Sequence, residues 1–121
     1  MIKERIKFTD YNGVVHEEDF YFNLSKAEIV EMEANEKEGL VEKINKVIEI
    51  NDRKEIVRIF KDIIAKSYGK KSEDGIRFIK NDEVKNEFLE SEAYSELFTK
   101  LANDEQAAVR FVNGILPANI Q

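Results

Sequence analysis

The first residues of the chain alternate between apolar and charged side chains. Between residues 2 and 8, isoleucine and phenylalanine are interleaved with lysine and arginine, a two-residue period that predicts a half-buried β-strand. Asn12 and Gly13 favour a tight turn, because both tolerate the positive φ angles that such a reversal requires. A second strand is predicted over residues 14–22. The sequence therefore predicts a β-hairpin within residues 1–24, which must pack on the following helices or extend a partner's sheet, since a lone hairpin is marginal in water.

A helical part is expected over residues 25–121, and it begins with a clear start signal. Ser25 can accept a hydrogen bond from the backbone N–H of Glu28, while the Glu28 side chain reaches back to Ser25. This first helix is expected to end by Gly39. A second helix is expected over residues 40–51, where apolar residues recur with a period of 3.6.

The strongest apolar pattern predicts a third helix, capped by Asn51 or Asp52. Apolar residues recur there at i, i+3, i+4, i+7 and i+8, namely Ile56, Ile59, Phe60, Ile63 and Ile64. Val57 is expected to widen this stripe, so that the helix is buried on more than one side. Burying five such side chains contributes on the order of 10 kcal/mol before entropy is counted, so this helix is the predicted centre of the core.

Local signals divide the remainder of the chain into short elements. Gly69 is expected at the C-terminal cap of the third helix, Asp74 and Gly75 in a second turn, and residues 76–79 in a short extended segment. Further helices are expected to start at Asn81 or Asp82, at Ser91, and at Asn103 or Asp104, and the last to end before Pro117. The predicted fold class is α+β, with an N-terminal β-hairpin packed on a bundle of five or six short helices, in a single domain of residues 1–121.

Charge is distributed unevenly along the chain. The 121 residues carry a formal net charge of -6, which argues against a nucleic-acid partner. Residues 53–80 nevertheless hold nine bases and four acids, whereas residues 82–105 hold eight acids and two bases. Such blocks are either solvated helix faces or complementary patches for self-association or partner docking. No apolar run approaches the ~20 residues that cross a bilayer, so we expect no membrane-spanning segment. We also expect no secretion signal.

Candidate chemistry is sparse. Residues 70–81 can be aligned with a calcium-binding loop, but Lys70 and Asn81 then occupy positions that require carboxylates, so a turn held by Ser72 and Asp74 is expected instead. His16 is the single histidine, and the acids beside it point to alternate faces of a strand. Cysteine is absent. We therefore expect no catalytic residue, no metal site and no cofactor.

Three segments carry a family resemblance. They read YFNLSKAE at residues 21–28, YGKKSEDGIRFIK at residues 68–80 and FLESEAYSELF at residues 88–98. In this order they resemble the tail assembly chaperones of long-tailed (siphovirus-type) bacteriophages and of prophages of Gram-positive bacteria. The resemblance spans almost the whole chain.

The resemblance implies a non-enzymatic protein that binds the tape measure protein during tail assembly and keeps it soluble. It implies action in the host cytoplasm, absence from the mature virion and a longer form made by ribosomal frameshifting. The major tail tube protein and a second copy of the chain are further candidate partners. Amphipathic aromatic residues such as tyrosine suit a groove that holds another chain. Four aromatic residues are candidate groove or core positions: Tyr68, Phe78, Tyr94 and Phe98. The alternative is an acidic phage adaptor or inhibitor that binds a host protein, with edge pairing of the hairpin as one route.

Overall fold

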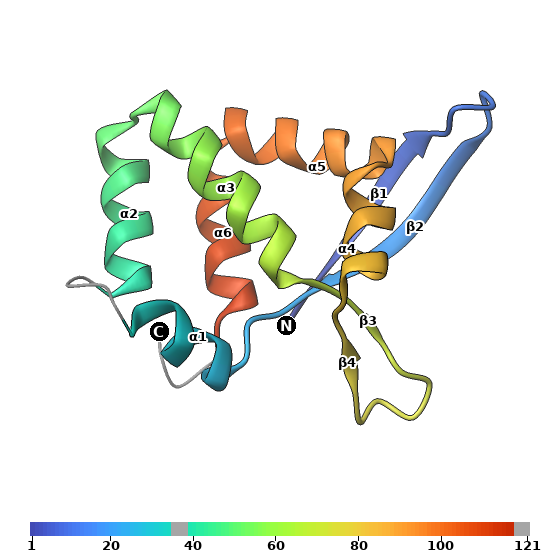
Figure 1. Ribbon diagram of the computed structural model, residues 1–121. Helices are drawn as coiled ribbons and strands as arrows, with labels where there is room; N and C mark the ends of the chain where they lie inside the picture. Colours follow the sequence, from blue (N-terminus) through green and yellow to red (C-terminus); the bar gives the residue numbers. More distant parts are fainter. Residues whose placement is uncertain (35–38, 118–121) are drawn as a thin grey trace.

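The computed structural model describes residues 1–34 and 39–117, apart from the side chain of Val41 (Figure 1). It is an α+β fold, as predicted. The strands are β1 (Ile2–Thr9), β2 (Val15–Phe22), β3 (Tyr68–Lys71) and β4 (Phe78–Ile79). The helices are α1 (Lys26–Glu33), α2 (Leu40–Ile50), α3 (Arg53–Ser67), α4 (Asp82–Leu89), α5 (Glu92–Asn103) and α6 (Glu105–Ile115).

The four strands form one antiparallel sheet in the order β1-β2-β3-β4. The predicted hairpin is confirmed, with pairing from Ile2 opposite Phe22 to Thr9 opposite Val15. Strand β3 pairs with the end of β2 and β4 pairs with β3, so the hairpin extends a sheet of its own chain. α5 and α6 pack on β1 and α4 packs on β3, while the tips of both hairpins extend beyond the helices (Figure 1).

The turn of the first hairpin differs in detail from the prediction. Gly13 has a φ of 83°, but Asn12 does not take a positive φ; among the described non-glycine residues only Asn51 does. The Asp10 carboxylate instead accepts hydrogen bonds from the backbone N–H groups of Asn12 and Val14, both at 2.9 Å. The side chain of Asp10 thus supplies the constraint that we had assigned to the backbone of Asn12.

The predicted start of α1 is confirmed. Ser25 Oγ accepts from the Glu28 N–H at 3.1 Å, and Glu28 Oε1 accepts from the Ser25 N–H at 2.9 Å. Lys80 Nζ donates to Glu28 Oε2 at 2.7 Å. Burial raises the pKa of the Glu28 carboxyl, but the bonds from Lys80 and Ser25 outweigh this effect and the pKa lies below its usual value. α1 ends at Glu33, and most of the segment in which we expected its end lies outside the described residues.

The apolar stripe of α3 is buried as predicted, and Asp52 is the capping residue, its side chain accepting from the Glu55 N–H. The prediction for Val57 is wrong. Val57 is 40% exposed, because it lies at the margin of the buried stripe and is not covered by the core. α3 is therefore covered on one side and open on the other.

The prediction for Gly69 is also wrong, because Tyr68 caps α3 and Gly69 lies in strand β3. A glycine is nevertheless required there by close packing. A Cβ atom at position 69 would lie 2.6 Å from the Phe78 ring and 3.0 Å from the Ile79 carbonyl oxygen, well inside van der Waals contact. Gly69 thus allows β4 to approach β3.

The starts of the last three helices follow the predicted signals. Asn81 caps α4 by accepting from the Val84 N–H, and Asp104 caps α6 by accepting from the Ala107 N–H, as expected for N-terminal caps. α5 starts after Ser91, whose hydroxyl donates to the Phe88 carbonyl and accepts no hydrogen bond from the N–H groups of its own helix. α6 ends at Ile115, before Pro117, as predicted.

Aromatic rings join the sheet to the helices in the core. Phe22 is fully buried and contacts Phe111 of α6 edge to face, with ring centroids 5.3 Å apart. Phe88 of α4 stacks on Tyr68 at 4.4 Å and meets Phe22 at 5.6 Å. This cluster fixes the position of α4, and with it the turn from α4 into α5.

Candidate protein-binding groove

The described surface carries an open groove between α3 and the α4–α5 turn. Its volume is about 710 Å³, within the range of roughly 300–1,000 Å³ that is typical of binding clefts. Six residues line it: Arg58, Lys61, Asp62, Ala65, Leu89 and Tyr94.

The two walls of the groove follow from the packing of the helices. α3 turns its isoleucine stripe toward the core, so that Arg58, Lys61 and Ala65 remain on the opposite side. The burial of Phe88 in the aromatic cluster leaves Leu89, the next residue, half-buried at the rim. One wall is therefore the polar side of α3, and the other is the partly apolar α4–α5 turn.

Tyr94 is the aromatic residue of this surface. It is half-buried, and its ring meets Phe88 edge to face at 6.0 Å and Phe98, one helical turn later, at 5.8 Å. Burial raises the pKa of its phenol. Its ring is thus supported from behind by Phe88 and Phe98 and has a face on the groove.

Electrostatic pairing is uneven along the α3 wall. Arg58 donates to Glu55 at 2.6 Å, and this hydrogen bond holds the pKa of the Glu55 carboxyl below its usual value. Asp62 pairs with Lys66 at 2.9 Å. Lys61 forms no ion pair with any described residue. The wall therefore presents one unpaired ammonium group in the groove.

The structure separates the four aromatic residues that the sequence grouped together. Tyr68 is 7% exposed and belongs to the core. Tyr94 lines the groove, and Phe98 is half-buried and contacts Tyr94. Phe78 is half-buried on β4, where its ring covers Gly69 and lies 5.6 Å from Lys80 Nζ. Tyr94 and Phe98 are thus brought together, and Phe78 does not line this groove.

Sequence reasoning missed the α3 side of the groove. Lys61 and Ala65 are four residues apart and lie off the predicted apolar stripe. A small residue one helical turn after a lysine is a weak signal by itself, because most such pairs are solvated surface. The groove exists only because α4 and α5 stand beside this side of α3, and sequence periodicity does not encode that placement.

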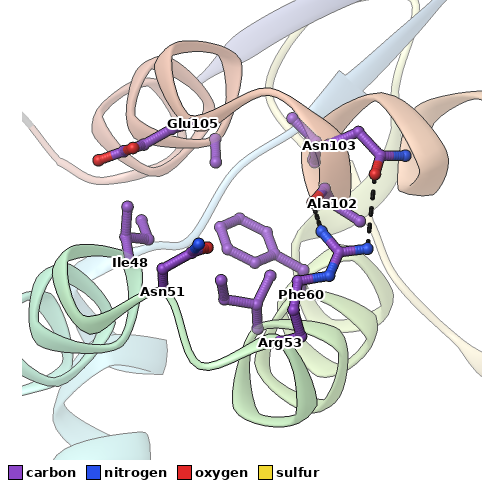
Figure 2. A pocket seen from close by; sticks show the side chains of 10 residues that line it. Ile48, Asn51, Arg53, Phe60, Ala102, Asn103 and Glu105 are labelled. Atoms are coloured by element: carbon purple, nitrogen blue, oxygen red, sulfur yellow. Dashed lines mark hydrogen bonds between the residues drawn. The ribbon is translucent and has the colours of Figure 1, made fainter.

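A second, smaller pocket lies where the α2–α3 turn meets the α5–α6 turn (Figure 2). Its volume is about 270 Å³, and Phe60 and Leu101 contribute to its buried side. Arg53 at its rim donates to the Ala102 carbonyl and to Asn103 Oδ1 (Figure 2). Because this guanidinium is engaged within the chain, it ties the two turns together.

The loop between β3 and β4 is held as predicted. Asp74 Oδ1 accepts from Ser72 Oγ at 2.7 Å and from the Ile76 N–H at 3.0 Å, and Gly75 has a φ of 76°. The pKa of the Asp74 carboxyl is lowered, first by the bond from Ser72. His16 lies elsewhere, half-buried and stacked on Phe8, with its Nε2 2.7 Å from Asp10 Oδ2. Within the part of the chain that the structure describes, no group of three or more His, Asp or Glu residues could hold a metal ion.

These features define a small α+β protein whose groove has the dimensions of a binding cleft. A family model described as phage tail assembly chaperone matches residues 1–121, and the chain belongs to this family. The resemblance noted in the sequence is thereby confirmed. No curated protein and no solved structure matches the chain. Among the described residues, no helix is long and apolar enough to cross a membrane.

Proposed function

We propose that this chain is a tail assembly chaperone that binds the tape measure protein of its phage and prevents its aggregation while the tail is assembled. The proposed action is binding without catalysis, in the host cytoplasm, by a single domain that is absent from the mature virion. Membership of the tail assembly chaperone family supports this proposal. The proposal goes beyond this family membership by naming the tape measure protein as the protein that is bound.

The groove beside Tyr94 is the observation that carries the proposal. A helix that binds in a groove does so through apolar residues at i, i+3, i+4 and i+7. The groove offers Leu89, Tyr94 and Ala65 to such a stripe. Tyrosine is enriched at sites that dominate binding energy, because it supplies a large rigid surface with a polar tip.

The charge of the chain suits a solubilising role. A net charge of -6 is in the range of about 2 to 8 in magnitude that keeps small domains soluble. A client helix that buries its apolar stripe in the groove would acquire this charged exterior. The complex would then resist the association that the exposed stripe otherwise causes.

Co-expression with the tape measure protein of the same phage tests the proposal. We expect the tape measure protein to be soluble with this chain, and to be insoluble either alone or with an unrelated acidic protein of similar size. Purification of the soluble fraction should recover both chains together. If the tape measure protein is equally insoluble with and without this chain, the proposed function is wrong.

A second candidate is an adaptor or inhibitor that binds a host protein through the edge of the sheet. Strand β1 favours it, since this eight-residue strand lies at the edge of the sheet, where strand addition occurs. Such an adaptor would leave the tape measure protein insoluble in the same co-expression. Size measurement of the purified chain would test self-association, and co-expression with the major tail tube protein would test that partner. Expression from the phage's own gene would show whether a longer frameshifted form is made.

A further inference from the structure

We infer that the groove selects an amphipathic helix whose apolar stripe is bordered, on the side facing α3, by aspartate or glutamate residues. This inference rests on the proposed function for the existence of a helical client. It adds the chemistry that the client must present. It also assigns Lys61 as the residue that pairs with the carboxylates of the client.

The two walls of the groove require different side chains from one bound helix. Leu89 and Tyr94 present apolar surface on the α4–α5 wall, and Ala65 on α3 leaves room for a client side chain. Arg58 and Lys61 stand on the α3 wall. A helix lying between these walls must turn apolar residues toward Tyr94 and polar residues toward Lys61.

The pairing of the charges selects acidic residues for that polar border. Arg58 is paired with Glu55 and Asp62 with Lys66, so these four charges are largely balanced. Lys61 has no ion-pair partner among the described residues. A docked helix removes water from Lys61, and an ammonium group that loses water without gaining a partner opposes binding. A carboxylate on the client supplies that partner.

The surrounding charge makes this preference unusual for the chain. With a net charge of -6, the chain as a whole attracts basic peptides and repels acidic ones. The groove wall lies within the basic block of residues 53–80, where the local charge is reversed. Net charge and the groove therefore predict opposite orders of affinity, and an experiment can separate them.

The test uses three synthetic helical peptides with the same leucine and alanine stripe, and with glutamate, glutamine or lysine along one border. Binding to the full chain is measured by fluorescence anisotropy at low and at high salt. We expect the glutamate peptide to bind about tenfold more tightly than the lysine peptide at low salt, and the difference to shrink at high salt because the ion pairs are screened. Equal affinities, or tighter binding of the lysine peptide, would overturn the inference.

Two variants locate the binding. Lys61→Glu should reverse the order of affinity of the glutamate and lysine peptides. Ala65→Arg should weaken the binding of all three peptides, because the larger side chain fills the space beside the α3 wall of the groove. Lys26→Glu is the matched control, because it makes the same charge change on α1, outside the groove lining, and should leave the order unchanged. Circular dichroism establishes that each variant is folded. If Lys61→Glu leaves the order of the peptides unchanged, the acidic border is not read by Lys61 and the inference fails.

The tape measure co-expression separates this inference from the proposed function. If the wild-type chain solubilises the tape measure protein but Lys61→Glu and Ala65→Arg do so equally well, the function stands and the groove is not its site. If the wild-type chain fails to solubilise the tape measure protein, the proposed function fails whatever the peptides do.

Discussion

The two tyrosines that contact the Phe88 ring differ in their surroundings. Tyr68 stacks on Phe88 at 4.4 Å within the core. Tyr94 meets Phe88 edge to face at 6.0 Å and lines an open groove. Two tyrosines that contact the same ring thus belong to a covered region and an open region. We expect the first to act mainly on stability and the second mainly on binding.

Substitutions in α3 should show the largest difference in stability between a covered and an open region, because this helix has one buried and one exposed side. Phe60→Asp places an unpaired charge at a position with no exposed surface and should reduce the free energy of unfolding by more than about 4 kcal/mol. Val57→Asp introduces the same carboxylate at an exposed position of the same helix and should have an effect within about 1 kcal/mol. Urea denaturation followed by circular dichroism measures both. A cooperative, stable transition for Phe60→Asp would show that the core is elsewhere.

Truncation of the core tyrosine should have the next largest effect. Tyr68→Ala removes a ring that contacts Phe20, Phe22 and Phe88 and should destabilise the fold by about 3–5 kcal/mol, as for other buried aromatic residues. Tyr68→Phe keeps the ring and should restore most of this loss. Thermal denaturation of the three proteins provides the comparison. A loss below about 1 kcal/mol for Tyr68→Ala would place Tyr68 with the open region.

Closer packing in the covered region gives a third prediction. Gly69→Ala introduces a methyl group that meets the Phe78 ring and the Ile79 carbonyl, and overpacking of this kind costs about 1–3 kcal/mol. Gly39→Ala is the control, because the one contact of its methyl group with a described residue, Glu33 Oε2 at 3.8 Å, is an ordinary van der Waals distance. Denaturation midpoints that are equal for the two variants would contradict the close contact of β3 with β4.

The elements that local chemistry determines could be predicted from the sequence. The capping box at Ser25 and the stripe through Phe60 involve residues within a few positions of one another, so the pattern contains the whole interaction. Strand β3 could not be predicted in this way. Tyr68-Gly69-Lys70-Lys71 has no apolar alternation, and it becomes a strand because Tyr68 pairs with Phe22, far away in the sequence.

The same reasoning applies to the groove. The sequence singled out Tyr94 and Phe98 together with Tyr68 and Phe78, because all four are aromatic residues that suit either a groove or a core. It could not distinguish them, since the exposure of an aromatic ring depends on which side of its element the tertiary packing covers. Tyr68 is covered because β3 pairs with β2 and α4 packs on β3. Tyr94 remains at the rim because α3 stands across the groove from it.

The smallest effect on stability is expected at Tyr94, and this variant tests the comparison most directly. Tyr94→Ala removes a half-buried ring that contacts Phe88 and Phe98 at the edge of the groove, and such a ring contributes less to stability than the roughly 3–5 kcal/mol of a fully buried one. We expect a loss of about 2 kcal/mol or less in the free energy of unfolding, below that of Tyr68→Ala. Solubilisation of the tape measure protein should nevertheless fall sharply, because the Tyr94 ring is the aromatic surface of the groove, and truncation of an aromatic residue that anchors an interface typically costs about 2 kcal/mol or more of binding free energy.

Tyr94→Phe separates the ring from its hydroxyl group in the same assays. If the ring packs against the apolar stripe of the client, Tyr94→Phe should retain most of the solubilising activity that Tyr94→Ala loses. If instead Tyr94→Ala is as unstable as Tyr68→Ala, both tyrosines are core residues and the proposed distinction between Tyr68 and Tyr94 is wrong. A stable Tyr94→Ala variant that solubilises the tape measure protein as well as the wild-type chain would place the client on another surface, because a folded groove without its aromatic wall could not then be the site of binding.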